Sequence, residues 1–311
     1  MELYHAPRFR STRVIILYKE LLQAYSSNPN ADDNDACKNK KDIEESVKTQ
    51  LPVLRVHTFH DTASFRSNKP EWYLKMNPNG KVPYFRDFLS NKNEGDTRSI
   101  IFTDLSECHT ANHSENGQIV EIFESMAICT YLLNRYDVEH KLLFKSDPRY
   151  EAKYLQMSYF ASGTVDNLTA NSSPIQRVVT KYTGETTPGK SSDMMELNEK
   201  AFIEVVGPIM DQLMNNEESR CQRGYLYGSN KFGAIDAILA YNMVVLHKRK
   251  GWLSMYCNKE IGENESKEKS ITPEHLKYTL LDYYKTKIVT RKSVQEAFGF
   301  TKEQLLEIIN Y

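Results

Sequence analysis

The sequence predicts a mixed α/β domain over residues 1–137 and an all-helical domain over residues 147–311. In the first part, short runs of β-branched and aromatic residues alternate with segments whose apolar residues recur every three or four positions. From residue 147 onward the periodic segments are all helical, and no convincing strand alternation remains. A chain of 311 residues is long enough for two such domains, since most domains have about 100–200 residues.

The first domain opens with a strand and a helix. Residues 3–6 read as a strand that stops at Pro7, and a helix follows from Ser11 or Thr12, either of which can cap its first turn. The polar stretch at 26–49 looks like an inserted loop. Strand character returns after it, at residues 52–59.

A tight turn comes next. Residues 70–74 begin a helical turn that runs into Asn-Pro-Asn-Gly at 77–80, a turn signature with two breakers. A strand follows at 82–85. Its Pro83 must lie at an edge or an end, because proline cannot donate to the hydrogen-bond ladder of a sheet.

The end of this domain contains two more strands and a helix. A second polar stretch, 89–118, holds a short extra strand at 100–102. We expect a strand at 119–123 and a helix that begins at Glu124 and Ser125. The resulting order is strand, helix, strand, turn, strand, strand, helix, which predicts a thioredoxin-like unit stretched by two insertions.

The second domain contains only helical patterns. Pro208 should kink one of its helices, because it lacks the N–H that the helix needs. The polar stretches at 181–194 and 258–270 look like loops. The expected helices cover residues 148–168, 195–215, 235–247, 273–289 and 292–298.

Composition excludes several classes of protein. The formal net charge of −1 gives no strong field that would favour nucleic acid or an anionic membrane. No apolar stretch approaches the roughly 18 residues of a membrane span, and the N-terminus lacks a signal-peptide pattern. The five cysteines are widely spaced without a C-x-x-C pair, so we expect neither a disulfide framework nor a metal site. The expected compartment is the reducing cytoplasm.

Three segments of the first domain resemble the cytosolic glutathione S-transferase family. Residues 3–7 (LYHAP) with 11–14 (STRV) resemble the family's first strand and helix start. Residues 77–83 (NPNGKVP) resemble its N-P-x-G-K-V-P turn, and residues 124–128 (ESMAI) resemble its E-S-x-A-I motif. Each motif alone is weak, but the set is specific because it occurs in the family's order and in matching structural positions.

The helical half is similar to the same family. Residues 160–163 (FASG) resemble the F-Q-x-S-G of fungal and bacterial members, and residues 293–297 (SVQEA) resemble a segment near the end of the helical domain. Residues 232–236 (FGAID) resemble its (F/Y)-(S/T)-x-A-D helix start, with Gly233 and Ile235 as departures.

The resemblance implies a cytoplasmic, homodimeric detoxification enzyme. Such an enzyme transfers the thiolate of glutathione, its co-substrate, to a small hydrophobic electrophile, and it needs no metal, nucleic acid or membrane. It also implies an alternative, since some relatives keep this architecture as non-catalytic binding or regulatory proteins.

The ends of glutathione suggest which residues hold it. A helix that opens at Ser125 presents unpaired N–H groups to the γ-glutamyl carboxylate, and Glu124 can pair with the α-ammonium. The resemblance implies a cis Val82–Pro83 bond that turns the backbone of Val82 toward the cysteinyl residue, and Lys81 can reach the glycyl carboxylate. Without the resemblance, Glu124 and Ser125 would read as an acid beside a plain helix cap.

The residue that activates the thiol is left open. Only the thiolate attacks, and several classes of the family stabilise it with a serine whose position here falls on Arg8 or Phe9. Ser11 is the nearest hydroxyl, although it serves equally well as a helix cap. The alternatives are charge stabilisation by Arg8 or Arg10, or a hydrogen bond from Tyr4. No cysteine lies in this region, which argues against thiol-exchange chemistry.

The hydrophobic substrate should contact the helical domain. An apolar stripe at helical spacing offers one wall, although such a stripe is also typical of a core. Its residues are Tyr154, Met157, Phe160 and Ala161.

Overall fold

The computed structural model describes residues 1–26, 51–89, 99–104, 118–145, 147–169, 196–214, 225–226, 231–248, 252 and 280–307. The chain divides into two compact units, Met1–Leu142 and Leu143–Tyr311. The loops expected at 181–194 and 258–270, and most of the two insertions of the first half, lie outside the described residues.

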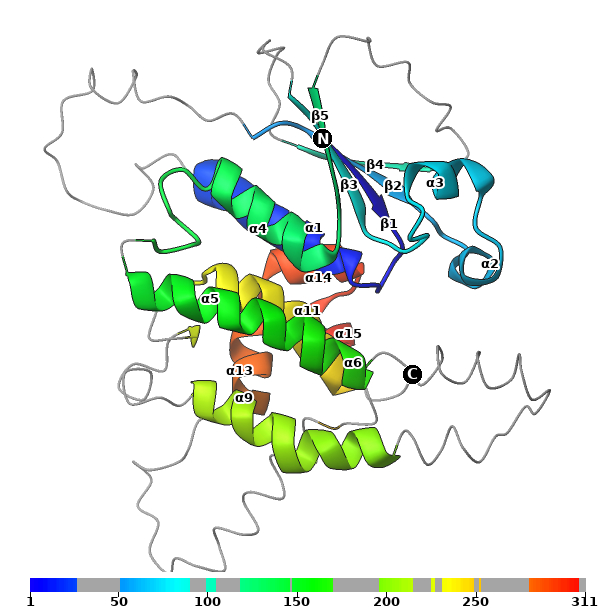
Figure 1. Cartoon of the computed structure of the whole chain (residues 1–311). Coiled ribbons are helices and arrows are strands. Elements are labelled where there is room, and N and C mark those ends of the chain that lie inside the picture. Colours follow the sequence, from blue (N-terminus) through cyan, green and yellow to red (C-terminus); the bar gives the residue numbers. More distant parts are fainter. Residues whose placement is uncertain are drawn as a thin grey trace, which may run out of the picture. The chain divides into compact units, whose positions relative to one another are not determined.

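A five-stranded mixed sheet forms the centre of the first unit (Figure 1). Neighbours along the sheet follow the order β4-β2-β1-β3-β5, in which β1, β2 and β4 are parallel and β3 and β5 are antiparallel to their neighbours. The extra strand expected at 100–102 is confirmed as β4, at the edge of the sheet. The strands are β1 (Glu2–His5), β2 (Leu54–Thr58), β3 (Tyr84–Leu89), β4 (Ile100–Asp104) and β5 (Gln118–Phe123).

Two long helices cover one face of this sheet. Helices α1 (Ser11–Ser26) and α4 (Ser125–Tyr136) lie side by side with their first residues at the same end (Figure 1). Leu3 and Phe85 point into this layer and are fully buried, and the Phe85 ring lies 6.0 Å from that of Tyr131 on α4. The expected helix starts at residues 11 and 125 are therefore confirmed.

The opposite face carries an aromatic cluster under two short helices, α2 (Thr62–Ser67) and α3 (Glu71–Met76). Because side chains alternate along a strand, Tyr4 and Tyr84 point away from Leu3 and Phe85. They pack against Phe65 and Tyr73, and the rings of Tyr4 and Tyr73 are 5.8 Å apart. The cluster fixes the segment that leads into the 77–80 turn.

The second unit consists of helices and π-helical turns among its described residues. Helix α11 is buried along nearly its whole length and therefore forms the core. The elements are α5 (Pro148–Phe160), η2 (Ala161–Val165), α6 (Asp166–Thr169), η3 (Phe202–Val206), α9 (Gly207–Met214), α11 (Ala234–Lys248), α13 (Leu280–Tyr283), η6 (Tyr284–Ile288), α14 (Lys292–Phe298) and α15 (Lys302–Glu307).

The helical segment around Pro208 contains a π-helical turn, and the kink expected at this residue stays a prediction. The π-helical turn η3 ends two residues before it. Proline removes one backbone hydrogen bond and crowds the carbonyl four residues earlier, which here belongs to Glu204.

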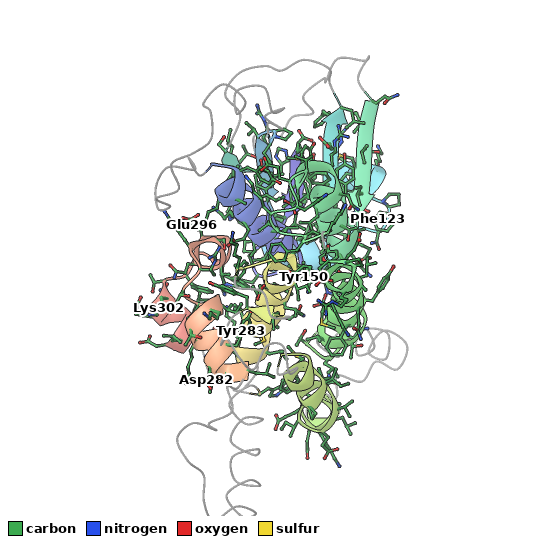
Figure 2. The ribbon with its side chains drawn as sticks, turned by 90° about the vertical axis from the view of Figure 1, so that its left-hand side faces the viewer. Phe123, Tyr150, Asp282, Tyr283, Glu296 and Lys302 are labelled. Carbon is green, nitrogen blue, oxygen red and sulfur yellow. The ribbon has the colours of Figure 1, made fainter. Side chains whose placement is uncertain are left out.

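The start of α11 is held by a buried carboxylate. Oδ1 of Asp236 accepts hydrogen bonds from the backbone N–H of Leu226, at 3.0 Å, and from the hydroxyl of Tyr283, while Oδ2 accepts one from Gly233 N–H at 2.9 Å. Tyr150, which is labelled with Tyr283 in Figure 2, accepts a bond from Ile235 N–H through its hydroxyl. Of the two hydrogen bonds of a capping box, the start of α11 thus keeps the one from the Gly233 backbone N–H to the Asp236 carboxylate, which needs no side chain at the cap position.

Candidate ligand site

The turn before β3 has the backbone geometry that the sequence predicts. The Val82–Pro83 peptide bond is cis. The Lys81 carbonyl accepts hydrogen bonds from the Tyr73 hydroxyl at 2.7 Å and from Asn77 Nδ2 at 2.8 Å, which pins the turn to α3. No hydrogen bond joins the Val82 backbone to another described residue. Its N–H and C=O therefore remain available to an extended ligand, as in β-strand addition.

Gly80 is required by this turn. Its φ of +62° lies in the left-handed region, which glycine enters at little cost. A Cβ at this position would lie 2.8 Å from Cδ of Lys69 and 2.9 Å from Cδ2 of Leu74. The neighbouring Lys81 is exposed, so its ammonium can meet an anion in solution.

Glu124 holds an unusual backbone conformation directly before α4. Its φ is +75° and its ψ is 117°, although it is not a glycine. Such a conformation costs about 1–3 kcal/mol and persists where the surrounding structure imposes it, often at ligand sites. The exposed carboxylate does not cap α4 and has no partner among the described residues. It therefore keeps its full capacity to bind a cation.

Ser125, the first residue of α4, is bound to a buried arginine. Nη1 of Arg13, on the first turn of α1, donates a hydrogen bond to Ser125 Oγ at 3.0 Å. Arg13 is fully buried, and Ser125 is 3% exposed. The first N–H groups of a helix have no intrahelical partner and carry the positive end of its dipole. Two helix N-termini and one guanidinium therefore converge beside Glu124, an arrangement suited to a carboxylate.

Ser11 lies next to this region but is occupied by its own neighbours. It is fully buried. Its Oγ lies 2.7 Å from His5 Nδ1, accepts a bond from Ala6 N–H at 3.4 Å and donates to the Ala6 carbonyl at 3.3 Å. Burial lowers the pKa of His5 to about 4, with a smaller contribution from the charge of His60. A neutral imidazole and Ser11 thus lock the junction between β1 and α1.

The other candidates for thiol activation differ in how far their side chains are exposed to solvent. Tyr4 is 3% exposed inside the aromatic cluster, and Phe9 packs against that cluster. Arg10 is partly exposed. Arg8 is exposed and has a φ of +67°, so it projects from the turn between β1 and α1.

The four residues predicted to contact a hydrophobic substrate lie on one helical stretch of the second unit. Tyr154, Met157 and Ala161 are buried, and Phe160 is partly exposed. The most exposed aromatic side chain of α5 is Tyr159, at 77%, which the sequence analysis did not single out. Helical spacing alone did not separate the exposed side of this helix from its buried side.

Arg13 is the residue of this site that the sequence analysis missed as a functional candidate. The available signal was a charged residue beside an apolar run, since residues 14–17 (VIIL) follow it. A cation at such a position is either buried against a polar partner or extended along the surface.

Neither a cluster of metal-ligating side chains nor a membrane-spanning helix occurs in the described ranges. No group of three or more His, Cys, Asp or Glu side chains lies there in an arrangement that could hold a metal ion. No helix in that part of the chain is both long and apolar enough to cross a membrane. Burial raises the pKa of the Cys129 thiol to about 12, which makes that thiol unreactive.

Known proteins resemble this chain in structure rather than in sequence. No protein-family model and no curated protein matches the sequence. The glutathione transferase URE2P8 from Phanerochaete chrysosporium, solved with oxidised glutathione, is 14% identical over 96% of this chain and 93% of its own, with a TM-score of 0.50. Ure2p in complex with glutathione has the same identity, the same coverage of both chains and the same TM-score. The chain therefore has the glutathione transferase fold.

Proposed function

We propose that the first unit binds glutathione and that the protein uses it in conjugation. The observation that carries the binding proposal is Glu124, held at positive φ with an unengaged carboxylate beside Ser125 and Arg13. Solved proteins of this fold that hold glutathione support it. The site offers one group for each charged end of the tripeptide.

The proposed contacts follow the chemistry of glutathione. Ser125 and the first N–H groups of α4 receive the γ-glutamyl carboxylate, and Glu124 pairs with the α-ammonium. The backbone of Val82, next to Pro83, pairs with the cysteinyl residue. Lys81 meets the glycyl carboxylate.

The proposed activity is transfer of the glutathione thiolate to a small hydrophobic electrophile. The thiol must lose its proton to react, and a nearby cation favours the thiolate. Arg8 is the exposed candidate for this task, whereas Ser11 would first have to give up its bonds to His5 and Ala6. Tyr154, Met157, Phe160 and Ala161 are the proposed electrophile contacts, and a cytoplasmic homodimer acting in detoxification is the proposed setting.

A non-catalytic binding or regulatory protein is the second candidate. The buried, fully engaged Ser11 favours it, and so does the resemblance, which places the activating serine of several classes on Arg8 or Phe9 in this chain. Such a protein would hold glutathione without lowering the pKa of its thiol.

Binding is tested by retention on immobilised glutathione and by calorimetric titration. We expect the wild type to be retained and to elute with free glutathione. Glu124→Gln and Lys81→Ala should each weaken binding about tenfold, the usual effect of losing about 1.4 kcal/mol. Lys75→Ala is the matched control, because Lys75 is an exposed lysine that pairs with Glu71 on α3. Equal losses in the control and in Lys81→Ala would count against the assignment of Lys81.

Catalysis is tested separately, by conjugation of a chlorodinitrobenzene-type electrophile. Turnover that falls in Arg8→Gln but persists in Ser11→Ala supports the proposed activation. Turnover abolished in a folded Ser11→Ala protein assigns the task to Ser11 instead. Glutathione binding without any turnover favours the non-catalytic candidate, and light scattering reports whether the protein is a dimer.

A further inference from the structure

The Ser125 hydroxyl accepts a hydrogen bond from an identified donor, but its own hydrogen has no identified acceptor. A serine hydroxyl donates one hydrogen and accepts through two lone pairs. Nη1 of Arg13 occupies an acceptor position of Oγ at 3.0 Å, since an arginine can only donate. No acceptor for the Ser125 hydroxyl hydrogen exists among the described residues. Ser125, a residue only 3% exposed, thus keeps its hydroxyl donor uncommitted at the start of α4.

Arg13 also places a permanent positive charge in this layer. Arginine stays protonated at any physiological pH, and its side chain here is fully buried. Its field reaches the first turns of α4: burial raises the pKa of Cys129, and the charge of Arg13 opposes that rise. Charges act more strongly across such a water-poor interior than at the surface. An anion that meets α4 at its first residue would therefore experience both the helix dipole and this charge.

A second hydroxyl at the same end of the helix pair is also unsatisfied. Oγ1 of Thr12, the residue before Arg13, is buried and has no hydrogen-bond partner in the described part of the chain. Buried polar atoms in folded proteins are nearly always paired. The paired N-termini of α1 and α4 therefore have more donor capacity than the described protein groups consume.

We propose that Arg13 is a positioning residue that orients the Ser125 hydroxyl so that it donates its hydrogen bond to an α-carboxylate of the ligand. Arg13 thereby favours ligands that carry an α-carboxylate. This inference rests on the proposed binding of glutathione. By occupying an acceptor position of Oγ, the guanidinium directs the hydroxyl hydrogen away from itself. Arg13 contributes its charge through the protein interior and does not contact the ligand.

The test compares two ligands in calorimetric titrations of the full chain. One is glutathione, and the other is γ-aminobutyryl-cysteinyl-glycine, which lacks only the α-carboxylate of the γ-glutamyl residue. Arg13→Lys should weaken glutathione binding about tenfold, in the range expected for a charge-assisted hydrogen bond, and should leave binding of the analogue within about twofold. Arg55→Lys is the matched control on an exposed arginine of β2 and should change neither.

A double-mutant cycle distinguishes positioning from a structural effect. If Arg13 acts through Ser125, Ser125→Ala should weaken glutathione binding about tenfold in the wild type and only about twofold in the Arg13→Lys background. Equal weakening of both ligands by Arg13→Lys, or additive losses in the cycle, would overturn the inference while leaving glutathione binding intact. Failure of the wild type to bind glutathione would refute the proposed function and the inference together.

A measurement on the unmodified sequence covers the case in which Arg13→Lys does not fold. The guanidinium resonances of Arg13 in an ¹⁵N-arginine-labelled protein should shift on addition of glutathione and stay in place with the analogue. Identical responses to both ligands would contradict the inference.

Discussion

Acidification should destabilise the first unit through His5. The ring is 4% exposed, and its Nδ1 lies 2.7 Å from Ser11 Oγ at the junction of β1 and α1. Burial, with a smaller effect of His60, lowers its pKa from 6.5 to about 4. In the unfolded chain His5 takes up a proton below about pH 6.5, whereas the folded protein resists protonation down to about pH 4.

The size and sign of the effect follow from that difference. The contribution is fully present above the unfolded pKa of 6.5 and is lost progressively as the pH falls toward about 4. A shift of about 2.5 pKa units corresponds to about 3 kcal/mol at most, since one unit is worth about 1.4 kcal/mol. This is a large fraction of the total stability of a typical domain.

Urea unfolding of the wild type and of His5→Asn, measured at several pH values between about 7.5 and about 4.5, tests this. Asparagine keeps an amide nitrogen near the place of Nδ1 but does not titrate, so the variant should lose less stability on acidification. His247, whose pKa burial also lowers, is present in both proteins and cancels in the comparison. Equal acid sensitivity of the two proteins, or an NMR titration that places the pKa of His5 near 6.5, would refute the reasoning. His60→Asn, on an exposed neighbour, should leave most of the sensitivity in place.

Four further substitutions test the backbone and capping arguments. Glu124→Gly should stabilise the first unit by about 1 kcal/mol in thermal unfolding, because glycine relieves a positive φ, and should weaken glutathione binding; a fall in stability would contradict the strain. Gly80→Ala should lower the stability of the folded protein by about 1–2 kcal/mol. The control Gly163→Ala lies in a helical segment with open space around the new methyl group, and it should raise the stability by about 0.5–1 kcal/mol. Equal effects of the two substitutions would argue against the turn geometry at Gly80. Asp236→Ala should cost about 3 kcal/mol, since three buried donors lose their acceptor, and a loss below about 1 kcal/mol would show that water replaces the carboxylate.

Periodicity and turn chemistry predicted most of the architecture. The helix starts at Ser11 and Ser125 follow from apolar spacing, and the strand after Pro83 follows from the absence of a proline N–H. The cap expected of Ser11 or Thr12 is wrong, because Ser11 Oγ bonds to His5 and Ala6 and Thr12 Oγ1 has no partner among the described residues. The six residues of α2 were missed because so short a helix has no resolvable period, and its cap at Asp61 becomes visible only with its bond to Ser64 N–H. The π-helical turns were not predicted, because the 3.6-residue apolar period does not distinguish them from α-helix.

The sequence predicted which residues form the candidate site, apart from Arg13, but it did not predict their backbone conformations or their burial. Sequence alone assigns no positive φ to Glu124, because nearly all non-glycine residues avoid it. Burial separated the candidates for thiol activation: Ser11 and Arg8 are three positions apart, yet one is enclosed and the other exposed. The bond from Arg13 to Ser125 joins residues 112 positions apart, and no local pattern predicts such a pair.

A crystal structure of the full chain with glutathione tests the central claim most directly. We predict the γ-glutamyl carboxylate at hydrogen-bond distance, about 2.7–3.2 Å, from Ser125 Oγ and the first N–H groups of α4. The cysteinyl residue should pair with the Val82 backbone. Glutathione bound elsewhere, or bound with its γ-glutamyl end away from α4, would contradict the account.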